Sequence, residues 1–305
     1  MPTARVLCWR RLNGQRSEVR MKAEIYYFSG TGNSLTIAKE LAGRLDAGLI
    51  SIHLVMSGSE IQTDADIIGI VFPVYYGELP AIVKNFASGM VGIGGKYIFA
   101  VCNFGGAAGG CLDTLKRILT KRGGMLSAGY GIHMPQNAFL KPWEKHGKVY
   151  ASCRKRIDSV IRNTRAGEKG MFLSNPPLEL LMRPMYSLLK PMYTKKFVKL
   201  TGAPPDTGLD KLIAQIDRSF YTSDQCSGCG LCVKVCPVGN IGIEGGRPVW
   251  RNHCENCLAC HNWCPNKAIQ GAVAEKGYFY RHPDVCIGEM IASGKEVNDK
   301  TSLSI

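Results

Sequence analysis

From residue 21 to about residue 136, short apolar runs alternate with segments in which apolar residues recur at helical spacing. The runs are nearly continuous, which is typical of parallel strands covered by helices on both faces. The pattern therefore predicts an α/β fold with a doubly wound, five-stranded parallel sheet, whose ligand-binding loops follow the carboxyl ends of the strands. The expected strands are residues 24–28, 49–53, 67–72, 97–103 and 129–134.

The pattern becomes helical and basic between residues 141 and 220, a segment that we interpret as a connector. Several apolar residues in it recur at helical spacing and predict a helix that packs on one of the domains. A helix lying on a membrane surface is the alternative. These apolar positions are Leu181, Met185, Leu188, Leu189 and Met192.

The remaining boundaries follow from composition. Residues 1–20 are rich in arginine and show no packing pattern, so they form either a disordered extension or a segment before a true start at Met21. We expect five segments in all. They are the N-terminal extension 1–20, the α/β domain 21–140, the connector 141–220, a small cysteine-rich α+β domain 221–272 and a C-terminal tail 273–305.

The cysteine-rich segment holds two copies of one motif, C-x-x-C-x-x-C-x-x-x-C-P. This is the spacing of bacterial ferredoxins with two [4Fe-4S] clusters, in which the fourth cysteine of each copy binds the other cluster. Paired zinc sites, the alternative, do not explain a proline after each fourth cysteine. The expected ligand sets are Cys226, Cys229 and Cys232 with Cys264, and Cys254, Cys257 and Cys260 with Cys236.

A second motif follows the first expected strand and is rich in hydroxyls and glycines. Such a loop, followed directly by a helix, forms a cradle for an anion. A Walker A loop would need a lysine where Asn33 stands, and a dinucleotide fingerprint would need a glycine where Leu35 stands. The loop consists of Ser29, Gly30, Thr31, Gly32, Asn33 and Ser34.

This loop resembles the phosphate loop of flavodoxins, and the whole pattern resembles fused flavodoxin-like and two-cluster ferredoxin proteins. The resemblance implies bound FMN, with Tyr75 or Tyr76 stacking on the flavin; the alternative is that these tyrosines cover the sheet edge. The loop from Asn103 to Gly110 offers no obvious second ring. The flavin-flanking residues implied by the resemblance are Pro73, Val74, Tyr75, Tyr76 and Gly77, and Asn103, Phe104 and Gly105.

Charge limits the choice of partners. The formal net charge is +14, which falls to about +8 once two clusters and one FMN are counted. This balance does not favour nucleic acid as a partner. The basic residues of the connector predict an acidic redox partner protein, and a solvated helix face is the alternative. These residues are Arg154, Lys155, Arg156, Lys195, Lys196 and Lys199. The sequence has no apolar run long enough for a membrane span and no secretory signal, so we expect a cytoplasmic protein with at most weak membrane-surface association.

Neither a nucleophile nor an acid–base pair is identifiable, and no catalytic residues are assigned. The leading hypothesis is a low-potential electron-transfer protein that relays electrons between the two clusters, FMN and a partner. Two alternatives stay open. One is a flavin-dependent reductase that acts on a small substrate, and the other is a ferredoxin whose FMN site is vestigial.

Overall fold

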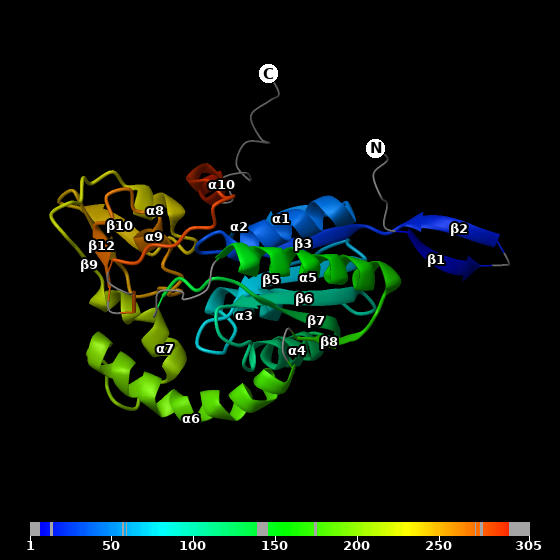
Figure 1. Ribbon diagram of the computed structural model, residues 1–305, viewed down its shortest axis with the longest axis horizontal. Helices are drawn as coiled ribbons and strands as arrows, with labels where there is room; N and C mark the ends of the chain where they lie inside the picture. The colour runs from blue at the N-terminus through cyan, green and yellow to red at the C-terminus, as the bar shows by residue number, and fades with distance from the viewer. Residues whose placement is uncertain are drawn as a thin grey trace, which may run out of the picture. The chain divides into compact units, whose positions relative to one another are not determined.

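The computed structural model describes residues 7–12, 15–56, 58, 60–138, 146–173, 176–271, 273–274 and 277–292 (Figure 1). Its contacts divide the chain into two compact units. The first unit comprises residues 1–28, 34–135 and 144–182, and the second comprises residues 29–33, 136–143 and 183–305. A short loop from the N-terminal half, residues 29–33, is thus grouped with the C-terminal unit.

The first unit is built on a six-stranded sheet in the order β4-β3-β5-β6-β7-β8, with all neighbours parallel. The first five strands have the 2-1-3-4-5 order of the flavodoxin-like fold, so the predicted doubly wound fold is confirmed. These strands are β3 (Ala23–Tyr27), β4 (Gly48–Ser51), β5 (Ile67–Pro73), β6 (Tyr97–Phe104) and β7 (Leu126–His133). They match the predicted strands to within a few residues.

The sixth strand, β8 (Gly170–Phe172), lies at the sheet edge, inside the segment expected to be a connector. A three-residue strand leaves no alternating pattern to recognise. Helix α5 (His146–Ala166), also expected in the connector, packs on β7. The α/β unit therefore extends past the expected boundary at residue 140, and the sheet has six strands rather than five.

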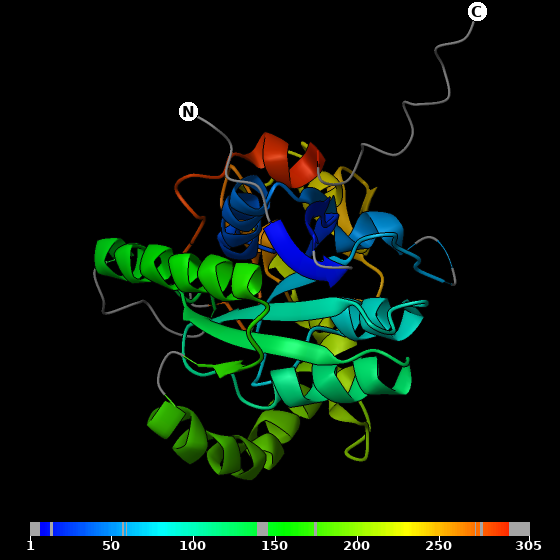
Figure 2. The same ribbon diagram turned by 90° about the vertical axis from the view of Figure 1, so that its right-hand side faces the viewer.

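Helices cover both faces of the sheet (Figure 2). A Cβ on Gly129 would meet Leu112 of α4 (Cys111–Lys121), whereas Tyr130 lines a pocket with Val160 of α5. Successive strand residues point to opposite faces, so α4 and α5 lie on opposite sides. The shorter helices of this unit are α2 (Ile52–Val55) and α3 (Ala81–Gly89).

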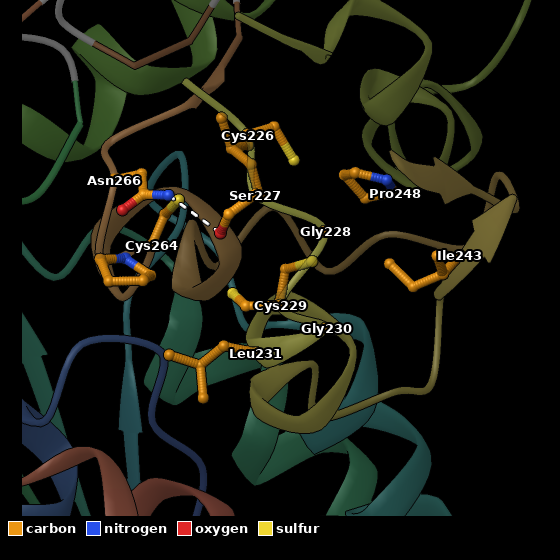
Figure 3. A pocket seen from close by; sticks show the side chains of 13 residues that line it. Cys226, Ser227, Gly228, Cys229, Gly230, Leu231, Ile243, Pro248, Cys264 and Asn266 are labelled. Carbon is orange, nitrogen blue, oxygen red and sulfur yellow. Dashed lines mark hydrogen bonds between the residues drawn. The ribbon is translucent and has the colours of Figure 1, made fainter. Parts of the chain in front are cut away.

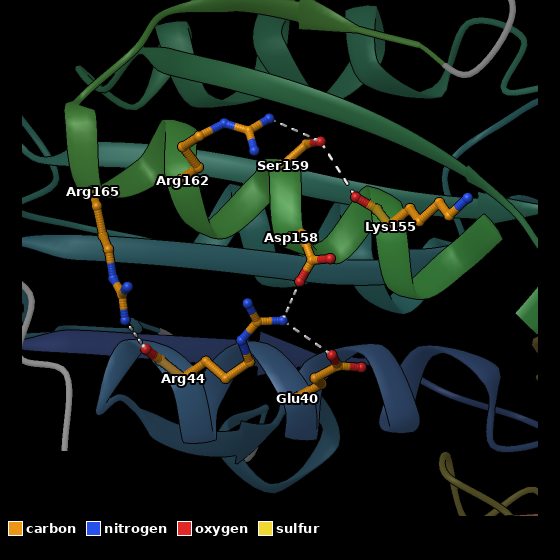
Figure 4. Close-up of polar contacts among 7 residues, drawn as sticks. All are labelled: Glu40, Arg44, Lys155, Asp158, Ser159, Arg162 and Arg165. Carbon is orange, nitrogen blue, oxygen red and sulfur yellow. Dashed lines mark hydrogen bonds and ion pairs between the residues drawn. The ribbon is translucent and has the colours of Figure 1, made fainter. Parts of the chain in front are cut away.

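Helix α1 (Asn33–Leu45) shares its face of the sheet with α5 (Figure 4). Arg44 of α1 lies 2.7 Å from the carboxylate of Asp158 on α5, and Arg165 donates a hydrogen bond to the carbonyl of Arg44 at 2.6 Å. The Asp158 carboxylate raises the pKa of the Arg44 guanidinium. These surface contacts fix α5 beside α1 but add little stability by themselves.

The N-terminal extension contains a hairpin of β1 (Leu7–Leu12) and β2 (Gln15–Arg20), paired antiparallel. A disordered extension is one of the two expectations for residues 1–20, and the structure instead contains this hairpin. The overlooked signal is Asn13-Gly14 between the two strands in the sequence, a dipeptide typical of two-residue hairpin connections. A start at Met21 stays a prediction.

The second unit carries the small α+β module. Strand β9 (Tyr221–Thr222) pairs antiparallel with β12 (Ile269–Gln270), and β10 (Ile241–Glu244) pairs with β11 (Arg247–Trp250). One short helix lies within each cysteine array and contains its third cysteine, and the two helices contact each other. The helices of this unit are α7 (Leu209–Ala214), η1 (Ile216–Ser219), α8 (Leu231–Val235), α9 (Ala259–Asn262) and α10 (Ile287–Ala292).

The long helix α6 (Pro176–Thr201) corrects one expectation. Leu188 is 79% exposed and Met192 is 56% exposed, so the prediction that these residues pack on a domain is wrong. The buried contact of this helix comes instead from Phe197, which is fully buried one turn beyond the predicted stripe. The side chains of Leu181 and Met185 lie outside the described residues. None of the helices in the described part is long and apolar enough to cross a membrane.

Candidate iron-sulfur and flavin sites

The first cysteine array curls around a pocket. It is lined by Cys226, Cys229 and Cys232 together with Cys264, which comes from the second array (Figure 3). Gly228 and Gly230 between these cysteines have φ values of 68° and 70°, in the left-handed region that glycine adopts without strain. The chain can therefore turn tightly enough to aim three sulfurs at one point.

Cys264 is fixed in this pocket by the turn that follows it. The side-chain amide of Asn266 donates to the carbonyl of Gln225 at 2.9 Å and to the hydroxyl of Ser227 at 3.0 Å (Figure 3). Both acceptors flank Cys226, so the end of the second array is tied to the start of the first. The structure brings together the four cysteines of the first expected ligand set.

The second array is more deeply buried. Cys257 and Cys260 are 7% and 8% exposed, whereas Cys229 of the first array is exposed. Burial raises the pKa of the Cys257 thiol well above its usual value and that of Cys260 to about 12, and interaction with Cys236 contributes to both shifts. Cys236 is thus within electrostatic range of the second array, in keeping with the expected exchange of ligands.

Burial also raises the pKa of the Cys232 thiol to about 11 and the pKa of the Cys254 thiol well above its usual value. Electrostatic interaction with neighbouring cysteines contributes to both increases. At neutral pH these thiols are protonated unless a cation replaces the proton. Binding of a cluster must therefore release protons.

Backbone N–H groups donate hydrogen bonds to the sulfurs of Cys236 and Cys264, the two cysteines that are expected to bind the cluster of the other array. The N–H of Asn240 donates to Cys236 Sγ at 3.3 Å, and the N–H of Ala268 donates to Cys264 Sγ at 3.3 Å. Each donor lies four residues after its cysteine, as the internal repeat implies. Such hydrogen bonds stabilise thiolates and tune the potential of iron-sulfur clusters.

The donor sets fit clusters better than single ions. All eight array cysteines are free thiols. Among the described residues, no three His, Cys, Asp or Glu side chains come close enough together to hold one metal ion. Three cysteines of one array that share a pocket with the fourth cysteine of the other suit a [4Fe-4S] cluster, whereas zinc needs a compact tetrahedral set.

The phosphate loop, residues 29–34, follows β3 and ends in the first residues of α1, which begins at Asn33. Ser29, Thr31, Asn33 and Ser34 are all buried, at 9%, 4%, 7% and 1% exposure. The N–H of Gly32 donates to the Ser29 hydroxyl at 3.1 Å, and Ser29 keeps its own hydrogen for a further acceptor. Buried hydroxyls at the start of a helix suit a phosphate, because the helix N-terminus favours negative charge.

Within the first unit, Asn103 joins two of the predicted flavin loops. Its side-chain amide donates to Ser34 Oγ at 2.6 Å and to the carbonyl of Phe72 at 3.0 Å. Pro73 and Asn103 are partners in the β5–β6 pairing, and the N–H of Val74 donates to the carbonyl of Asn103 at 2.9 Å. The loops after β5 and β6 therefore lie side by side, and their contact with a flavin stays a prediction.

The two tyrosines occupy a tight turn. Tyr75 and Glu78 exchange backbone hydrogen bonds of 3.1 and 2.9 Å across Tyr76 and Gly77. Both central residues have positive φ, 54° for Tyr76 and 73° for Gly77. Tyrosine rarely adopts this conformation, and strain of this kind is concentrated at functional sites. Tyr75 and Tyr76 are half-buried, so their roles as stacking partners stay predictions.

Phe104 does not supply the second ring. It is 7% exposed, its ring lies 6.5 Å from that of His133, and a Cβ on Gly131 would meet it at 3.0 Å. His133 is not among the predicted site residues, and its Nε2 lies 3.1 Å from the carbonyl of exposed Gly105. No motif marks this histidine in the sequence, because it lies on a strand that carries none.

A second pocket lies in the first unit between α5 and the strands β7 and β8. Stacked rings of Tyr130 and Phe172 line it, 5.0 Å apart, together with Arg156 and Arg162. Arg156 also donates to the carbonyl of Leu173 at 2.6 Å. Part of the basic connector is thus built into the α/β unit.

Comparisons with known proteins support the assignment of an iron-sulfur module. The family described as 4Fe-4S dicluster domain matches residues 225–269. Over 79 residues the chain is 39% identical to an uncharacterized ferredoxin of Methanocaldococcus jannaschii, a match that covers 23% of this chain and 45% of that protein. The chain thus matches less than half the length of this relative.

Solved structures similar to the chain include two flavodoxins. The flavodoxin of Streptococcus pneumoniae TIGR4 is 18% identical with a TM-score of 0.32, over 47% of this chain and 97% of that one. Two-electron reduced flavodoxin of Megasphaera elsdenii is 20% identical with a TM-score of 0.31, over 46% and 98%. The flavodoxin-like assignment here rests on the strand order of the sheet.

The chain therefore joins a flavodoxin-like sheet to a ferredoxin-type iron-sulfur module. Iron-sulfur clusters transfer electrons, and this combination supports a redox role in electron transfer.

Proposed function

We propose that this chain is a low-potential electron-transfer protein that holds two [4Fe-4S] clusters and FMN and passes electrons to a redox partner. The observation that carries the proposal is the exchange of cysteines between the arrays. Cys264 of the second array lines one pocket with Cys226, Cys229 and Cys232, and Cys236 contributes to the raised pKa values of Cys257 and Cys260. Two interlocked cysteine sets are what a two-cluster ferredoxin needs.

FMN takes up one or two electrons and each cluster one, so the combination suits exchange between one-electron and two-electron partners. Different side chains serve the clusters and the flavin. The exposed position of Cys229 gives a partner access to the first set, whereas burial keeps solvent from Cys257 and Cys260 in the second. Ser29, Thr31 and Ser34 supply hydroxyl donors for the FMN phosphate.

A reductive titration tests this function. Anaerobically prepared full-length protein with complete iron and flavin should accept about four electrons per chain, one for each cluster and two for FMN. The measurement is stepwise addition of dithionite, followed by visible absorbance. Uptake of only about two electrons at full iron content would show a ferredoxin without a working flavin site.

We further propose that the partner is acidic. Lys195 and Lys199 are exposed on α6, one helical turn apart, and Arg154 and Lys155 are exposed on α5. The basic residues of the connector thus lie on two helices rather than on one, and Arg156 is half-buried. Opposite charge speeds transient encounters between redox proteins more than it strengthens the complex.

Charge reversal on α6 is expected to slow electron transfer to the partner. The Lys195→Glu/Lys199→Glu variant should lower the second-order rate about tenfold at low salt and reduce its salt dependence, because screening becomes strong near 0.1 M, where the Debye length is about 10 Å. Stopped-flow measurement against an acidic ferredoxin checks this. Lys116 and Lys121, exposed on α4, provide a control with the same change in net charge. Equal rates in both variants would contradict docking at α6.

A further inference from the structure

We propose that the iron-sulfur module holds the phosphate loop in its binding conformation, with Trp263 and Tyr280 as positioning residues. FMN affinity then depends on the folded module, and cluster retention depends in turn on FMN. The inference rests on the proposed function, because it takes the phosphate loop as the FMN site. It adds a role for residues that no motif singles out.

The loop is anchored through its carbonyl groups. Trp263, which stands between Cys260 and Cys264, donates its indole N–H to the carbonyl of Gly30 at 3.0 Å. The backbone N–H of His282 donates to the carbonyl of Thr31 at 2.9 Å. All of these residues belong to the second unit.

This anchoring orients the donors of the loop. The described part of the chain has no cis peptide bond, and in a trans peptide the C=O and N–H groups point in opposite directions. The N–H groups of Thr31 and Gly32 therefore point away from Trp263 and His282. The N–H of Gly32 donates to the Ser29 hydroxyl, a residue of the same loop. Trp263 and His282 thus hold the loop by its carbonyl groups and leave the opposite side, with the N–H groups, to the loop itself and to an anion.

Side-chain hydrogen bonds hold the phosphate loop as well. The Thr31 hydroxyl accepts a hydrogen bond from the Asn137 amide at 3.2 Å and so keeps its own hydrogen for an anion. The Tyr280 hydroxyl donates to Asn33 Oδ1 at 2.6 Å. Tyr280 is 3% exposed, so this bond is shielded from water.

A short chain of hydrogen bonds links Tyr280 to the second array. The N–H of Tyr280 donates to Asn262 Oδ1 at 2.7 Å, and the Asn262 amide donates to the carbonyl of Leu258 at 3.0 Å. Leu258 directly follows Cys257. Asn33, Tyr280 and Asn262 thus connect the start of α1 to the backbone that carries a cluster ligand.

The loop glycines fit the same explanation. A Cβ on Gly30 would lie 2.4 Å from the carbonyl oxygen of Cys257, and one on Gly32 would lie 2.9 Å from Cβ of His282. Both glycines therefore permit close approach to the module. Because two ligands that stabilise one conformation must strengthen each other equally, FMN and the second cluster are thermodynamically linked.

The test uses variants that remove one donor each, Tyr280→Phe and Trp263→Phe, in the full-length protein with its clusters. FMN and riboflavin, which lacks the phosphate, are the two probes, and flavin fluorescence gives the dissociation constants. Each variant should bind FMN about tenfold more weakly and change riboflavin binding less than about twofold. Iron content is measured in each preparation before the titration, so that weaker FMN binding is read only from protein with its clusters in place.

Tyr97→Phe is the matched control, since it removes a 2.6 Å hydrogen bond from a tyrosine hydroxyl to a backbone carbonyl in the first unit. Its FMN affinity should equal that of wild type. Unchanged FMN binding in both test variants, or an equal loss of affinity for riboflavin, would overturn the proposal that the module holds the phosphate loop. If one of the two variants loses iron, the FMN affinity of the other variant decides whether the proposal holds. If wild type itself binds no FMN, the proposed function fails instead.

Discussion

Replacing Cys236 with alanine is expected to remove the cluster of the second array while leaving that of the first. Cys236 follows Cys232 closely in sequence, yet it contributes to the raised pKa values of Cys257 and Cys260 in the second array. A [4Fe-4S] cluster with three cysteine ligands loses iron readily. Iron and sulfide should therefore fall from about eight of each per chain to about four.

The matched measurement compares Cys236→Ala with Cys264→Ala by EPR of the reduced proteins. The two variants should lose different cluster signals, and Cys264→Ala should lose that of the exposed first array. Cys286→Ala is the control, because Cys286 is exposed and outside both arrays. If Cys236→Ala instead lost the signal of Cys226, Cys229 and Cys232, ligation would be local within each array.

Replacing Gly30 with alanine is expected to damage the flavin and iron-sulfur sites together. The new methyl group would lie 2.4 Å from the Cys257 carbonyl oxygen and 2.9 Å from Cys257 Cβ, so backbone must move. Overpacking of this kind costs about 1–3 kcal/mol in the free energy of unfolding. The temperature at which cluster absorbance is lost should fall by roughly 2–12 °C, and FMN affinity should fall with it.

Gly43→Ala provides the control. Gly43 lies within α1, and a Cβ there would meet nothing within 4 Å. This change should stabilise the helix by about 0.5–1 kcal/mol and leave both cofactors in place. Thermal scans followed at the cluster absorbance and by flavin fluorescence distinguish the two glycines. A Gly30→Ala protein as stable as wild type would show that the loop does not contact Cys257 in solution.

The sequence predicted the sheet well, because each of the five long strands is an apolar run bounded by turn residues. It missed β8, which is three residues long, and it misjudged α6, where Leu188 and Met192 are exposed. Apolar spacing shows that a helix has an apolar stripe but not which surface, if any, covers that stripe. Contacts at long sequence separation decide this.

By itself, the sequence determined the α/β fold and the iron-sulfur chemistry. Strand burial leaves a local pattern, and cluster ligation demands cysteines at fixed short spacings. The tertiary structure alone decided what surrounds the phosphate loop. Trp263 reaches Gly30 across 233 positions and Tyr280 reaches Asn33 across 247. No periodicity or spacing records pairs so far apart, because their proximity arises only when distant segments pack together.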